Sequence, residues 1–174
     1  MITLICATHR PQNQTQKIVR FYKEILTAEG YQPAVLMMNE LPEDFVYSDS
    51  FGKRNTPTAA LIEEKLGPAE KLVIIAPEYN GSYPGVFKAF LDGVEPKLWK
   101  GKKVALVGVA SGRAGNLRGM DHLTDVCHYL RMEVFSLKVP ISRLSEMLSE
   151  DGQNLADTET RAVLQQQARE FMDF

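Results

Sequence analysis

The chain has 174 residues, 44% hydrophobic and 24% charged, which suits one globular domain spanning residues 1–174. Its net charge of −2 leaves no basic field to attract nucleic acid or an anionic membrane, and no apolar run reaches the roughly 18 residues that span a bilayer. The N-terminal apolar run is too short for a signal peptide, and one pair of cysteines is no disulfide framework. We therefore expect a cytoplasmic domain in which Cys6 and Cys127 are buried free thiols.

Three short, nearly continuous apolar runs predict strands that are covered on both faces. They are Ile2 to Ala7, Leu72 to Ala76 and Val104 to Ala110. Two weaker runs, Ala34 to Met38 and Glu133 to Val139, predict two further strands. The segment 39–55 has no period and many polar residues, which is typical of a mobile or functional loop.

Apolar residues at helical spacing separate the predicted strands. The stripes run over residues 18–26, 61–69, 86–91, 117–130 and 164–172, and Gly30 is placed to end the first helix. Strands that alternate with helical crossovers build a parallel sheet, because each helix returns the chain to the same edge. The sequence therefore predicts a three-layer, doubly wound α/β fold with a five-stranded parallel sheet in the order 2-1-3-4-5.

Ligands of such sheets bind outside the carboxyl ends of the strands, so the loops after strands 1, 3 and 4 are the candidate site. The first loop, residues 7–15, enters a helix and offers hydroxyls, amides and a guanidinium from Thr8, Arg10, Asn13, Gln14 and Thr15. A helix N-terminus with such donors suits phosphate. The alternative is that Asn13 or Thr15 only caps the helix. The loop is neither a G-x-x-x-x-G-K-[ST] nor a G-x-G-x-x-G motif.

The other two loops are less specific when each is considered alone. The second, residues 77–85, brings Tyr79 and a glycine-bearing backbone to the binding edge, although Asn80-Gly81 also reads as a plain turn. The third, residues 110–115, has glycines that allow a ligand close to the backbone, and Arg113, which is otherwise an exposed arginine. Together the three loops predict a pocket for a planar, phosphate-bearing cofactor.

The run from Pro77 to Asp92 resembles the P-E-Y-N-G-S-x-P-G-x-x-K-N-A-[LI]-D motif of the NADPH-dependent FMN reductase family, which includes quinone, azo-dye and chromate reductases. The first loop is similar to the family's phosphate loop, with Ala7 and Asn13 where glycine and serine are usual. The third is similar to its S-x-G-G-R-x-G-G loop. The resemblance implies a flavodoxin-like fold that binds FMN through Thr8, Arg10, Asn13, Gln14, Thr15, Pro77, Glu78, Tyr79, Asn80, Gly81, Ser111, Gly112 and Arg113.

The resemblance also implies an activity. NADPH or NADH would reduce the flavin, which would pass the electrons to a small acceptor such as flavin, a quinone, an azo compound or a metal ion, without a catalytic side chain or a metal site. The subunits would form a homodimer or homotetramer through the helix near residues 82–91 and the segment 39–55. Two alternatives stay open, namely a flavodoxin-like electron carrier and a homologue with weak or lost flavin binding.

Overall fold

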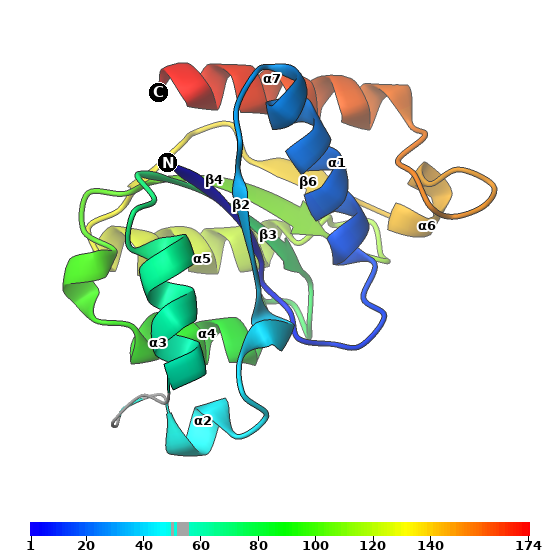
Figure 1. The fold of residues 1–174 in the computed structure, drawn as a ribbon. Helices are drawn as coiled ribbons and strands as arrows, with labels where there is room; N and C mark the ends of the chain where they lie inside the picture. The colour runs from blue at the N-terminus through cyan, green and yellow to red at the C-terminus, as the bar shows by residue number, and fades with distance from the viewer. Residues whose placement is uncertain (50, 52–55) are drawn as a thin grey trace.

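The computed structural model describes residues 1–49, 51 and 56–174, and its strands form one parallel sheet (Figure 1). The strands are β1 (Ile2–Cys6), β2 (Ala34–Met37), β3 (Lys71–Pro77), β4 (Lys103–Val109), β5 (Glu133–Val134) and β6 (Val139–Ile141). The order is β2-β1-β3-β4-β5, with β6 also paired to β4. The predicted order is therefore confirmed, and all carboxyl ends lie at one edge.

Helices cover both faces of the sheet, which confirms the three layers (Figure 1). The helices α1 and α7 pack on one face, and α3, α4 and α5 pack on the other. None of the described helices is long and apolar enough to cross a bilayer. The bounds are α1 (Thr15–Ala28), α2 (Phe45–Ser48), α3 (Thr56–Leu61) with a π-helical turn (Ile62–Leu66), α4 (Gly85–Gly93), α5 (Leu117–Tyr129), α6 (Leu144–Met147), α7 (Thr158–Asp173), and the 3-10 turns Met38–Glu40 and Pro96–Leu98.

The central strands are buried on both sides because their side chains alternate between the two helical layers. In β1, Leu4 and Cys6 contact the layer of α1 and α7, whereas Ile5 faces the opposite layer. Helix α1 ends where Gly30 predicts, in a left-handed residue with φ of 88°. The N–H of Tyr31 then reaches back to the carbonyl of Leu26 at 2.9 Å, which closes the helix.

The predicted strand from Glu133 to Val139 is wrong as one element, because the chain leaves the sheet after β5 and returns as β6. The buried side chain of Gln167 in α7 stands at this interruption. Its Nε2 donates to the carbonyl of Leu106 at 3.0 Å and to that of Leu137 at 2.7 Å. The glutamine thus provides hydrogen bonds where the ladder is broken, so that the carbonyl groups are not left unpaired in the interior.

The segment predicted as an irregular loop, residues 39–55, contains regular structure in its first half. The 3-10 turn Met38–Glu40 and helix α2 lie there, and the buried ring of Phe45 packs against Phe90 at 6.3 Å between centroids. The apolar anchor explains why this half is structured. Residues 50 and 52–55 lie outside the described residues, so the mobility of the segment stays a prediction.

Cys6 and Cys127 are free and fully buried, as predicted. Burial raises the pKa of each thiol to about 12, so both stay protonated near neutral pH.

Candidate functional site

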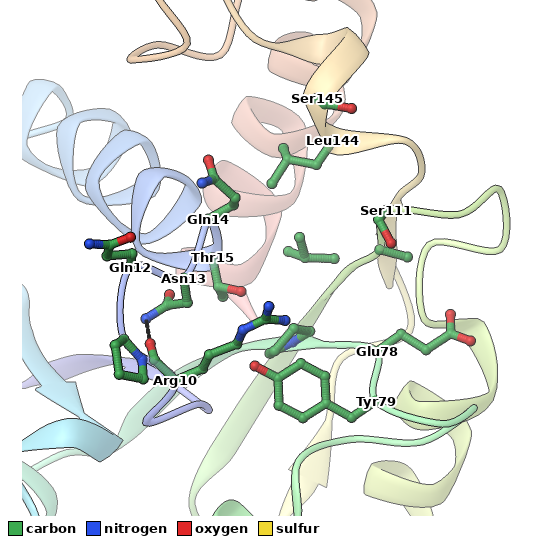
Figure 2. A pocket seen from close by; sticks show the side chains of 14 residues that line it. Arg10, Gln12, Asn13, Gln14, Thr15, Glu78, Tyr79, Ser111, Leu144 and Ser145 are labelled. Carbon is green, nitrogen blue, oxygen red and sulfur yellow. Dashed lines mark hydrogen bonds between the residues drawn. The ribbon is translucent and has the colours of Figure 1, made fainter.

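A cavity of about 370 Å³ opens at the carboxyl edge of the sheet (Figure 2). Its volume is in the range of small-molecule sites. All three loops expected from the sequence contribute to it, and the predicted residues that line it are Arg10, Asn13, Gln14, Thr15, Pro77, Glu78, Tyr79 and Ser111. The structure therefore brings together residues that are separated by about a hundred positions in the sequence into one pocket.

Asn13 organises the first loop. Its Oδ1 accepts a hydrogen bond from the backbone N–H of Gln16 at 3.0 Å, and its Nδ2 donates to the carbonyl of Arg10 at 2.9 Å. The Asn13 side chain therefore binds a backbone N–H of the first turn of α1, although the N-cap is Gln14, whose side chain makes no capping hydrogen bond, and the loop is held in a fixed shape. Gln12 takes a left-handed conformation with φ of 53°, which turns the chain into α1.

This loop presents a group of donors to the cavity. Among the described residues, no acceptor pairs with the backbone N–H groups of Gln12, Asn13, Gln14 and Thr15, which all line the pocket at the start of α1. Figure 2 shows the side chain of Arg10 reaching into the same space. The positive end of the helix dipole points there as well. Unpaired N–H groups, a guanidinium and a helix N-terminus are groups that can bind an anion such as phosphate.

Thr8 supports the site from behind. It is fully buried and lies outside the cavity lining. Its Oγ1 accepts from the N–H of Arg10 at 3.2 Å and shares a hydrogen bond of 2.8 Å with the hydroxyl of Tyr79. Thr8 thus joins the first loop to the second, and it fixes the direction of the tyrosine ring that lines the pocket.

The second loop contains a tight turn. Asn80 and Gly81 both have positive φ, of 51° and 76°, and reciprocal backbone hydrogen bonds of 2.8 and 3.1 Å join Tyr79 to Ser82. This is the geometry of a two-residue hairpin turn, so the turn predicted at Asn80-Gly81 is confirmed. Asn80 and Gly81 lie outside the residues that line the cavity, and Gly81 lies against the guanidinium of Arg118 instead.

Glu78 lines the pocket, yet its carboxylate is turned away from it (Figure 2). Its Oε2 accepts from the backbone N–H of Asn116 at 3.2 Å, the residue between the third loop and α5. A second interaction between strand ends joins the N–H of Glu78 to the carbonyl of Val109 at 2.8 Å. The two loops beside the cavity are therefore fastened to each other.

Gly112 and Arg113, in the third loop, also lie outside the lining residues. Their carbonyl groups are bound by the segment that follows β6: Gly112 accepts from the N–H of Arg143 at 2.8 Å, and Arg113 accepts from Oγ of Ser142 at 2.7 Å. These contacts bring a fourth segment to the rim of the pocket.

Sequence reasoning missed several lining residues, namely Pro11, Gln12, Val109, Ala110, Leu144 and Ser145. Leu144 and Ser145 belong to α6 and follow the last strand of the sheet. The rule that ligands bind outside the carboxyl ends of parallel strands could have indicated them, because it applies to every strand of the sheet, including the last one. Pro11 and Gln12 lie between the predicted residues Arg10 and Asn13, and the left-handed turn at Gln12 brings them to the cavity wall.

Residues 1–143 match the sequence profile of the NADPH-dependent FMN reductase family. The chain belongs to this family. It is similar to a 2-hydroxy-1,4-benzoquinone reductase from a Burkholderia species, with 30% identity over 132 residues that cover 74% of this chain and 70% of that protein.

Two solved structures bear out the flavodoxin-like fold. One is a flavoenzyme NAD(P)H:(acceptor) oxidoreductase from Paracoccus denitrificans, with a TM-score of 0.80 at 22% identity over 99% of this chain and 94% of that one. The other is a flavodoxin from Megasphaera elsdenii, with a TM-score of 0.58 at 15% identity over 98% and 99% of the two chains.

Proposed function

We propose that this protein is an FMN-dependent NAD(P)H oxidoreductase that passes electrons from NADPH or NADH through bound FMN to a small acceptor. The observation that carries the proposal is that the residues with unpaired backbone donors at the start of α1 line the same cavity as Tyr79. FMN combines the two chemistries that this site offers, because it has a phosphate at one end and a flat ring system at the other.

The phosphate would be held by the first loop. Residues 12–15 and Arg10 all line the cavity, and their backbone N–H groups and the Arg10 guanidinium can donate to phosphate oxygens. Asn13 would contribute its N–H, since its side chain is used within the loop. These local donors offset the charge of the phosphate, which is needed because a chain of net charge −2 has no overall positive field to attract it.

The ring would lie between the second and third loops, beside Tyr79 and the backbone of Pro77, Ala110 and Ser111. Bound FMN supplies the hydride chemistry, and the protein supplies position, shape and exclusion of water. No acid, base or nucleophile of the chain is assigned to the reaction. Contacts from Asn80, Gly81, Gly112 and Arg113 to the cofactor or the donor stay predictions.

A quinone is the acceptor to test first, since the Burkholderia relative is named a reductase of 2-hydroxy-1,4-benzoquinone. The proposal predicts NADPH or NADH oxidation that depends on FMN and on an added benzoquinone. A protein that binds FMN but accepts electrons from neither nucleotide would be an electron carrier, and this result would contradict the oxidoreductase proposal.

We also propose a homodimer or homotetramer that associates through the face around α4 and α5. Phe51 and Tyr129 are exposed there, at 82% and 87%, beside an apolar groove of about 510 Å³. Large exposed aromatic side chains of this kind often mark an interface. Light scattering on the purified protein tests the assembly, and a monomer at micromolar concentration would refute it. The two free thiols support the cytoplasmic location that we expect.

A further inference from the structure

Asn116 is an unusual residue at the edge of the site. It precedes α5, is fully buried, and has a left-handed backbone with φ of 63°. Its Oδ1 is buried and finds no hydrogen-bond donor among the described residues. A positive φ and a buried unpaired oxygen both cost stability, and an outlier of this kind beside a pocket motivates a functional hypothesis.

The contacts of Asn116 join the two loops that flank the cavity. Its Nδ2 donates to the carbonyl of Ala76 at 3.0 Å, near the end of β3. Its backbone N–H donates to the carboxylate of Glu78 at 3.2 Å, at the start of the second loop. One residue of the β4–α5 connection therefore holds the β3 end in two places.

The surrounding chain makes room for this side chain. A Cβ on Gly119 would collide with the Asn116 amide, and one on Gly108 would lie 3.1 Å from the Asn116 Cβ. Glycine at position 116 itself would adopt the backbone conformation without strain and would remove the unpaired oxygen. Asparagine is thus explained by its bond to Ala76 and not by the backbone.

We propose that Asn116 is a positioning residue that sets the spacing between the β3–α4 and β4–α5 loops and so shapes the space for the flavin ring. The inference rests on the proposed FMN binding. It assigns Glu78 the same task, since the Glu78 carboxylate points to Asn116 and away from the cavity (Figure 2). Groups that hold binding residues in place affect ligand affinity, because a site that is about 1 Å too loose no longer has the productive geometry.

The test compares the stability and the FMN affinity of Asn116→Gly. Melting of the apoprotein should stay within about 4 °C of the wild type, because the relieved strain offsets the lost bond. The FMN dissociation constant, measured by quenching of FMN fluorescence, should rise about tenfold or more. The control is Arg131→Gly, at another left-handed residue, with φ of 61°, which is exposed and lies beyond the opposite end of α5. It should leave FMN affinity unchanged.

Glu78→Ala tests the same link from its other end and should also weaken FMN about tenfold with little change in melting temperature. FMN affinity within twofold of the wild type in either variant would overturn the inference. The inference would also be overturned if Asn116→Gly loses FMN binding together with a large fall in its melting temperature while Glu78→Ala binds FMN normally. A wild-type protein that does not bind FMN would overturn the proposed function, and this inference with it.

Discussion

Arg10→Ala is the most informative single change in the site. The guanidinium reaches into the cavity beside the unpaired N–H groups of α1, and the described residues place no carboxylate within ion-pair distance of it. Its removal should therefore leave stability nearly unchanged. A hydrogen bond to a charged group contributes about 1.5–3 kcal/mol, so the FMN dissociation constant should rise about 12- to 150-fold.

Riboflavin makes this prediction specific to the phosphate, because it carries the same ring without that group. Fluorescence titration should show that Arg10→Ala weakens FMN but leaves riboflavin affinity within about twofold of the wild type. The control is Arg169→Ala, an exposed arginine that pairs with Glu29 away from the cavity. Equal weakening of FMN and riboflavin, or an unchanged FMN constant, would refute the assignment of Arg10 to phosphate.

Three further predictions concern packing, thiol chemistry and pH. Gly108→Ala should lower the free energy of unfolding by about 3 kcal/mol, since the new Cβ would collide with the backbone carbonyl of Gly115; a loss below about 1 kcal/mol in urea unfolding would contradict this packing. Cys6 and Cys127 should resist a thiol reagent at about pH 8 while the protein is folded, because burial raises both pKa values to about 12. Both thiols should react once urea unfolds the protein. Rapid labelling of the folded protein would contradict their burial. Hydrogen bonds from Thr160, in the first turn of α7, lower the pKa of Asp157 below its usual 3.8, so the stabilising effect of the carboxylate is present above that pH and is lost as the pH falls further. Asp157→Ala should therefore lower the melting temperature at neutral pH but not in strong acid. A difference in melting temperature that persists in acid would contradict this cause.

The three central strands could be predicted from the sequence because they are continuous apolar runs, and the burial of Leu4, Val73 and Leu106 is the physical cause of that pattern. The interruption between β5 and β6 could not be predicted in the same way. The carbonyl of Leu137 at this interruption is bound by the side chain of Gln167, about thirty residues later, which in the sequence is one glutamine in a polar run of α7. Hydrogen bonds between distant segments leave no local pattern.

The residues of the site were also predicted only in part. The residue types of the first loop predicted donors for an anion, and Arg10, Asn13, Gln14 and Thr15 among them line the cavity. The roles within the loop could not be read from residue type, because Thr8 and Asn13 use their side chains on the loop itself and on Tyr79. Asn116 was not predicted at all, since its importance comes from its conformation and from its contacts with the end of β3.

The measurement that tests the account most directly is the visible spectrum of the purified protein, recorded before and after addition of FMN and then of anaerobic NADPH or NADH. We predict a bound flavin band near ~450 nm that bleaches with at least one nucleotide and returns when a benzoquinone is added. A band that neither nucleotide bleaches would contradict the oxidoreductase activity. The absence of any bound flavin after addition of FMN would contradict the cofactor site itself.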